Sequence, residues 1–210
     1  MGNMKSPYMK LFAPILGEPG TIPDSLTSFE FLPNNQPMEI LAKSLCNERS
    51  KFMSFCAYSL FLIGGFNELN LNASLIPEIA KVAPAGSSFR QILHYFQEHL
   101  SGKFREWDYG PKKNKEVYGK EEPPEYPVDK IKAPTHFYYS KNDFMSSDVD
   151  VEKLAKKMKK EYVRELYLIP DHKFTHLDYL YGLNSKKVVY DRIRDNIVTC
   201  GDNKVTNLHP

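Results

Sequence analysis

The sequence contains no apolar run long enough to cross a membrane and no marked excess of charge of either sign. Its longest apolar stretch, residues 52–66, is shorter than the roughly 18 to 20 residues that a transmembrane helix needs, so we expect no membrane span. The formal net charge of +2, from 28 basic and 26 acidic residues, gives no reason to expect nucleic acid as a partner. With 41% hydrophobic residues among 210, the chain is able to bury one sizeable core.

The amino-terminal residues also lack the uninterrupted apolar run and cleavage site of a signal peptide. Two features nevertheless favour the secretory route. Cys46 and Cys56 have a spacing compatible with a disulfide-closed loop, although two buried thiols fit equally well. Asn72 begins an Asn-Ala-Ser glycosylation pattern, which also arises by chance. Because these features conflict with the missing signal peptide, we expect the sequence to be part of a longer protein.

The first 130 residues are predicted to be helical and irregular. Residues 1 to about 40 are rich in proline and glycine, which predicts mostly irregular chain with short helical turns. Apolar periodicity then predicts helices over 37–46, over 51–65 with Gly64-Gly65 at its end, and from about 88 to 101 with a serine cap. Residues 104–129 are dense in proline and charge, which predicts a long surface loop and a boundary.

The pattern changes after residue 130. Aromatic and β-branched runs over 131–140 and 162–170 predict two strands. Residues 146–161 between them predict an amphipathic helix with a Ser/Asp capping box, whose lysines form a solvated face or, less simply, a partner-binding patch. A last helix is predicted over 185–198. This order predicts an α/β fold with two parallel strands, and their unpaired edges indicate the end of a larger sheet.

Two polar residues stand where reactive groups collect in open parallel sheets, in the loops after the strands. Asp143 follows the first predicted strand and His176 follows the second. A carboxylate followed along the chain by a histidine matches the order of the second and third members of an α/β-hydrolase triad. From the pattern alone, Asp143 is equally well explained as a helix cap or turn residue, and His176 as an ordinary loop residue.

A metal site is the alternative use of the same histidine. His172 and His176 have the i, i+4 spacing of a helical zinc pair, but no glutamate stands between them and no third ligand cluster is evident. We therefore expect neither metal nor cofactor, and we interpret His172 as a loop residue. His94 and His99 are interpreted as helix-surface or partly buried residues, and Asp178 as a cap or supporting group.

Three segments, residues 83–110, 123–158 and 174–197, resemble the carboxyl half of the animal acid lipases, the gastric and lysosomal enzymes and their digestive relatives. They agree with that family in order and spacing from about residue 3 to 198. The resemblance implies an incomplete α/β-hydrolase fold. Residues 1–127 would form the helical cap and lid, 128–199 the last two strands and helices of the core, and 200–210 a tail.

The resemblance also assigns roles to individual residues. It implies that Asp143 is the acid and His176 the histidine of the catalytic triad, that Cys46 and Cys56 form the lid-region disulfide, and that Asn72 is glycosylated. The implied substrate is a lipid ester at a lipid–water interface. The implied location of the full-length protein is secreted or lysosomal.

One departure from the family limits the functional prediction. The nucleophile pattern G-x-S-x-G occurs nowhere in these 210 residues. The sequence therefore predicts a hydrolase of triacylglycerols or sterol esters, represented by a stretch that lacks the nucleophilic serine and is inactive alone. The alternatives are a non-catalytic protein that binds lipid or a partner, and a metal-dependent hydrolase that uses His172 and His176.

Overall fold

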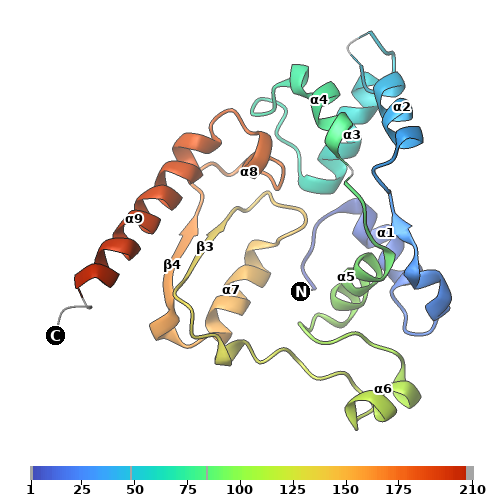
Figure 1. Cartoon of the computed structure of the whole chain (residues 1–210), viewed down its shortest axis with the longest axis vertical. Helices are drawn as coiled ribbons and strands as arrows, with labels where there is room; N and C mark the ends of the chain where they lie inside the picture. Colours follow the sequence, from blue (N-terminus) through green and yellow to red (C-terminus); the bar gives the residue numbers. More distant parts are fainter. Residues whose placement is uncertain (1, 48, 84, 207–210) are drawn as a thin grey trace.

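The computed structural model describes residues 2–47, 49–83 and 85–206 (Figure 1). Its helices are α1 (Pro7–Leu16), α2 (Gln36–Leu45), α3 (Met53–Gly64), α4 (Ile76–Val82), α5 (Phe89–Ser101), α6 (Pro111–Tyr118), α7 (Asp148–Lys157), α8 (Asp178–Tyr181) and α9 (Asp191–Thr206). Its strands are β1 (Glu30–Phe31), β2 (Ser87–Ser88), β3 (Thr135–Tyr139) and β4 (Val163–Leu168). Single helical turns occur at Asp24–Ser28, Ala73–Leu75, Val128–Lys130, Lys160–Tyr162 and Lys186–Tyr190.

The predicted parallel pair of strands is confirmed. β3 and β4 lie side by side in parallel, with Tyr138 opposite Tyr167 and Tyr139 opposite Leu168, and α7 forms the crossover between them. Aromatic and β-branched side chains favour this pleated arrangement because they pack well against their cross-strand neighbours. The parallel direction brings the carboxyl ends of both strands to one edge, so the loops that follow them start close together.

Helices cover both faces of this pair of strands. Successive strand residues point to opposite sides, so the neighbouring tyrosines Tyr138 and Tyr139 contact different helices. Tyr139 faces α7, where its hydroxyl donates to Glu152 over 3.2 Å. Tyr138 faces α9, where its hydroxyl accepts a hydrogen bond of 2.6 Å from Asn196. α9 continues to Thr206, past the predicted end at 198, and the side chain of Cys200 lies outside the described ones.

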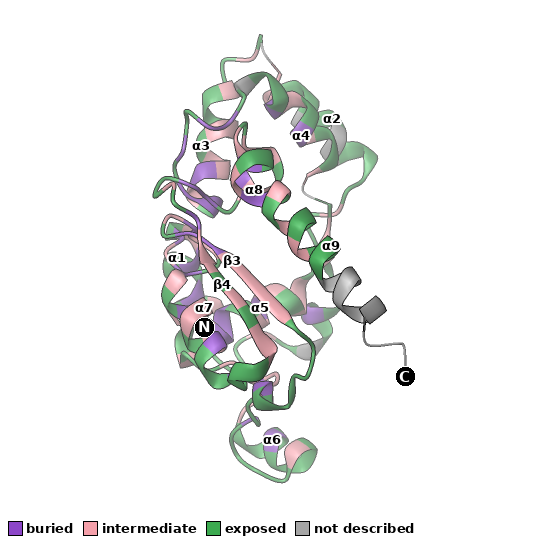
Figure 2. Ribbon diagram, turned by 90° about the vertical axis from the view of Figure 1, so that its left-hand side faces the viewer, coloured by how far each residue is buried: buried purple, intermediate pink, exposed green. Residues whose placement is uncertain are grey.

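The predictions of irregular chain for residues 1–40 and of loop for 104–129 are wrong in part, since α1 and α6 form there. α1 packs on α5, where Met9 and Ala13 share a buried cluster with Leu93 and Phe96. α6 begins at a proline and ends before a left-handed glycine, which are ordinary helix boundaries. In Figure 2 it lies at one end of the molecule, away from β3 and β4.

Two other local features differ from the sequence expectation. β1 pairs antiparallel with β2, a short ladder that joins Glu30 and Phe31 to the serines before α5. Ser147 stands at the N-cap position of α7, but its side chain makes no capping hydrogen bond. Asp150, its expected capping-box partner, instead accepts hydrogen bonds of 2.9 and 2.7 Å from the backbone and side chain of Asn3.

α3 ends at the predicted glycine pair, with Gly65 as its C-cap residue. A disulfide joins Cys46, just after α2, to Cys56 within α3, and their Cα atoms are 5.7 Å apart. Phe61 of α3 packs into a buried cluster with Leu71 and α4, whereas Phe52 and Phe55 are 58% and 66% exposed. Within the part of the chain that the structure describes, no helix is both long and apolar enough to cross a bilayer.

Candidate active site

Asp143 is a buried carboxylate held by its own loop. It lies after β3, and only 2% of its surface is exposed. One carboxylate oxygen, Oδ1, accepts backbone hydrogen bonds from Met145 over 2.8 Å and from Ser146 over 2.7 Å. These bonds fix the plane of the carboxylate and leave its second oxygen, Oδ2, directed away from the turn.

His176 lies opposite that second oxygen, in the loop after β4. Its Nδ1 is 3.0 Å from Asp143 Oδ2, although the two residues are 33 positions apart in the sequence. The side chain of Asp143 is 3% exposed and that of His176 is 47% exposed. When Nδ1 carries the proton and donates a hydrogen bond to the carboxylate, the lone pair of Nε2 is free to accept a proton from another group.

The carboxylate changes the acidity of the histidine. The hydrogen bond and the negative charge of Asp143 raise the pKa of His176, against the lowering effect of partial burial. The protonated imidazole is therefore stabilised in the folded chain. This is the electrostatic condition that a general base paired with an orienting carboxylate requires.

This raised pKa predicts a pH-dependent contribution to stability. Because the folded pKa lies above the unfolded value of about 6.5, the stabilisation is fully present below that pH and is lost as pH rises through the folded pKa. We expect unfolding in urea at pH 5.5 and 8.5 to show the wild type losing stability relative to His176→Gln at the higher pH. For a partly exposed pair the difference is at most about 1 kcal/mol. An equal gap between the two proteins at both values would contradict the prediction.

The end of α3 connects the two loops. The carbonyl oxygen of Gly64 accepts hydrogen bonds from the backbone amides of Phe144 over 3.2 Å and of His176 over 3.1 Å. Gly65 has φ +116°, and a Cβ at this position would lie 2.2 Å from the carbonyl oxygen of Asn142. Both its backbone conformation and this close approach require glycine. The sequence indicated only a helix end here, because the contacts come from residues far along the chain.

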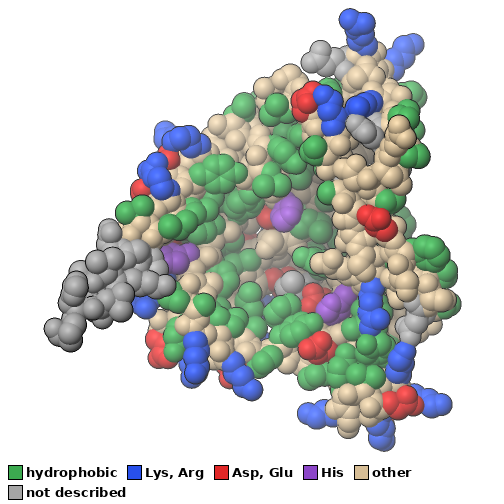
Figure 3. Space-filling model, in the orientation of Figure 1, with side chains coloured by type: hydrophobic (Ala, Val, Ile, Leu, Met, Phe, Trp, Pro, Cys, Tyr) green, Lys and Arg blue, Asp and Glu red, His purple; other side chains and the backbone are tan. Residues whose placement is uncertain are grey.

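A small cavity of about 150 Å³ adjoins His176. It is lined by Met4, Tyr95, Met145, Ser146, Ser147, Asp150, Val151, Leu154 and His176. In Figure 3 the face seen in Figure 1 is hollowed, and hydrophobic side chains gather around the hollow with histidine and acidic side chains within it. A mainly apolar surface next to the histidine is suited to a hydrocarbon group.

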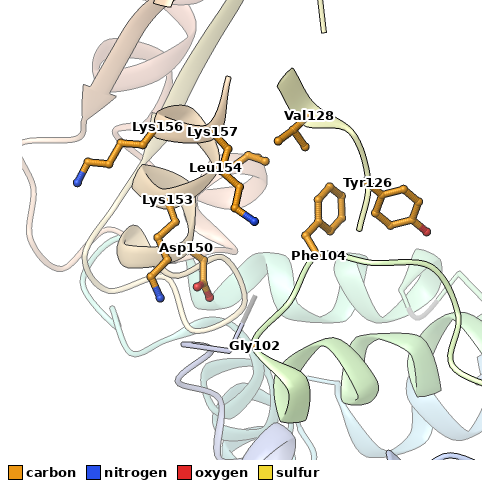
Figure 4. A pocket seen from close by; sticks show the side chains of 9 residues that line it. All are labelled: Gly102, Phe104, Tyr126, Val128, Asp150, Lys153, Leu154, Lys156 and Lys157. Atoms are coloured by element: carbon orange, nitrogen blue, oxygen red, sulfur yellow. The ribbon is translucent and has the colours of Figure 1, made fainter. Parts of the chain in front are cut away.

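A second hollow, of about 310 Å³, shares Asp150 and Leu154 with that cavity but is not lined by His176. Figure 4 shows its lining, which consists of Gly102, Phe104, Tyr126, Val128, Asp150, Lys153, Leu154, Lys156 and Lys157. The three lysines belong to the exposed side of α7, as the predicted solvated face requires. Lys157 forms an ion pair of 2.6 Å with Glu125.

The other predicted site residues do not join the pair. His172 is exposed, and no group of three metal-ligating side chains occurs among the described residues. His94 and His99 are half-buried, as expected. Asn72 is exposed, and its side-chain oxygen accepts hydrogen bonds from the backbone and hydroxyl of Ser74, so its glycosylation stays a prediction.

An aspartate and a histidine that meet after adjacent parallel strands have the geometry of the acid–base part of a hydrolase triad. No protein-family model matches the chain. Similarity to individual proteins is extensive. Lipase 3 of Drosophila melanogaster is 41% identical over 193 residues, which cover 92% of this chain and 48% of that protein.

Vertebrate proteins are similar over most of the chain as well. Human gastric triacylglycerol lipase is 30% identical over 179 residues, covering 82% of this chain and 44% of its own length. A putative lysosomal acid lipase/cholesteryl ester hydrolase of Crotalus adamanteus is 30% identical over 169 residues, covering 77% and 39%. The chain thus spans about half the length or less of these relatives. The resemblance to the acid lipases is confirmed, and over most of its length the chain is homologous to lipases of that group.

Proposed function

We propose that this chain is the carboxyl-terminal part of a lipase that hydrolyses triacylglycerols or sterol esters, and that it supplies the acid and the histidine of the catalytic triad. The observation that carries this proposal is the hydrogen bond between Asp143 Oδ2 and His176 Nδ1, in a chain homologous to lipases. In this proposal residues 1–127 form the cap and lid, and residues 128–199 complete the α/β-hydrolase core.

The chemistry assigned to the pair follows from its geometry. A serine hydroxyl from the remainder of the enzyme would lie at His176 Nε2 and lose its proton to that nitrogen while its oxygen attacks the ester carbonyl. The imidazolium would then return the proton to the leaving alcohol. Asp143 would hold Nδ1–H and stabilise the imidazolium, which agrees with the raised pKa of His176.

The exposed side of α3 is the proposed contact with the lipid surface. Phe52, Phe55 and Tyr58 are each more than half exposed on or beside this helix. Large apolar side chains that cluster at the surface favour binding to a partner or a membrane interface. The disulfide between Cys46 and Cys56 fits an oxidising compartment, and we propose that the full-length protein is secreted or lysosomal.

Hydrolysis by a chimera tests this function. We expect the 210-residue chain alone to hydrolyse neither tributyrin nor cholesteryl esters, because loss of a triad nucleophile reduces turnover by roughly 10⁶-fold. A fusion of the amino-terminal half of Drosophila Lipase 3 to this chain is expected to restore hydrolysis. Activity of the 210 residues alone that depends on His176 would contradict the proposed inactivity. A folded fusion without hydrolysis, together with vesicle binding by the chain, would favour the non-catalytic lipid-binding alternative.

A further inference from the structure

A reciprocal pair of hydrogen bonds joins Thr175 and Asp178, which flank His176 and Leu177 in the loop. The backbone amide of Thr175 donates to Asp178 Oδ2 over 2.7 Å, and the amide of Asp178 donates to Thr175 Oγ1 over 3.3 Å. Thr175 and Asp178 are each 2% exposed. This is the pattern of a capping box, and it fixes the backbone turn that carries His176.

Asn67 donates to the same carboxylate oxygen from a distant part of the chain. Its Nδ2 is 2.9 Å from Asp178 Oδ2, and the residue is 5% exposed. It belongs to residues 64–71, which comprise the last residue of α3 and the chain after it and lie beside α8 (Figure 1). We name these residues the connecting segment. Its first residue, Gly64, accepts the backbone amide hydrogen of His176.

Further contacts join the connecting segment to the histidine loop. The carbonyl oxygen of Phe66 and that of Lys173 both accept hydrogen bonds of 2.9 Å from the side-chain amide of Asn142. The carbonyl oxygen of Asn70 accepts the amide hydrogen of Leu183 over 2.8 Å. Among these contacts, the hydrogen bond from Asn67 is the one made to the carboxylate of Asp178 in the capping box.

We propose that Asn67 is a positioning residue for His176, acting through Asp178 to hold the turn in which the imidazole meets Asp143. This role rests on the proposed function, because it assumes that the pair takes part in hydrolysis. The hydrogen bonds do not depend on that assumption. Removal of Asn67 leaves the buried carboxylate with one donor fewer, which loosens the turn and lets the imidazole move away from Asp143.

The experiment is an NMR pH titration of the ring of His176 in the 210-residue chain, with the resonance assigned by its loss in His176→Gln. In Asn67→Ala we expect the pKa of His176 to fall, because the hydrogen bond with Asp143 is the largest cause of its raised value. Hydrogen exchange of the His176 amide is expected to accelerate by roughly ten-fold or more. If the alanine variant does not fold, Asn67→Ser replaces it, since serine is too short to reach Asp178.

The near-isosteric variant Asn67→Leu tests the contact directly. It keeps most of the side-chain volume but supplies no donor to Asp178 Oδ2, so we expect the pKa of His176 to fall as it does in Asn67→Ala. A folded Asn67→Leu variant with the wild-type pKa would refute the assignment.

Asn114 provides the matched control, because it is another buried asparagine bonded to an aspartate. It is 0% exposed and donates to Asp108 over 2.7 Å, but it lies on α6. We expect Asn114→Ala to destabilise the chain without changing the pKa of His176. Equal changes in Asn67→Ala and Asn114→Ala, or none in Asn67→Ala, would show that Asn67 has no positioning role. A chimera that fails to hydrolyse esters would reject the proposed function and leave this titration unaffected.

Discussion

Replacement of His176 by alanine in the chimeric lipase is expected to lower turnover by roughly 10⁵- to 10⁶-fold, with little change in folding. The imidazole is the group that takes and returns the proton, and it is nearly half exposed, so its removal empties no core. Asp143→Asn is expected to cost about 10⁴-fold, because the carboxamide favours the wrong tautomer of the histidine. Initial rates on tributyrin emulsions measure both effects.

His172→Ala is the control for that experiment. His172 is exposed and stands four residues before His176 in the same loop. It is expected to retain turnover close to that of the unsubstituted chimera, and a stoichiometric zinc determination on the chimera is expected to find none. Retention of more than about 1% of the rate by His176→Ala would assign the pair a structural role, because a triad histidine contributes far more than a hundred-fold.

Replacement of Phe174 by alanine is expected to destabilise the chain by about 3 to 5 kcal/mol, the range for large aromatic residues in a core. Phe174 is 0% exposed. It packs with Ile169 and Val189, and its ring meets the edge of Tyr179 with centroids 4.9 Å apart. Alanine leaves a cavity under the loop that carries His176. The free energy of unfolding in urea, at fixed pH and with the disulfide intact, measures the loss.

Phe55→Ala is the matched substitution at the surface. The side chain of Phe55 is 66% exposed, so its truncation is expected to change the unfolding free energy by less than about 0.5 kcal/mol. The effect is small because the exposed ring of Phe55 loses few contacts when it is truncated. A loss below about 1 kcal/mol for Phe174→Ala would indicate that the surrounding side chains close the cavity.

The sequence was sufficient to predict the parallel strands and the meeting of Asp143 with His176. β3 is rich in aromatic residues and β4 contains Val163 and Tyr167 beside two leucines, and parallel pairing alone brings the loops after the strands to one edge. Their catalytic role stays a prediction. A helix over Pro7–Leu16 was missed because its prolines outweighed a modest apolar periodicity. The packing of Met9 and Ala13 against α5 stabilises it, and that contact lies outside any local window.

Contacts between distant segments account for the other differences. Asp150 was expected to cap α7, but Asn3 reaches it from the other end of the chain. The two-residue strands β1 and β2 are too short to give a periodic signal, and each depends on the other. Asn67 lies in an asparagine-rich stretch without a known motif, so only its contact with Asp178 identifies it.

The contacts around His176 close chain loops of different length. The hydrogen bond between Asp143 and His176 spans 33 residues, and the intervening chain contains α7 and β4. Closing a loop of 33 residues costs roughly 1 kcal/mol less chain entropy than closing one of 111 residues. The connecting segment joins from much further away, since Asn67 is 111 residues from Asp178. The acid and the histidine are therefore brought together at a smaller entropic cost than Asn67 and Asp178.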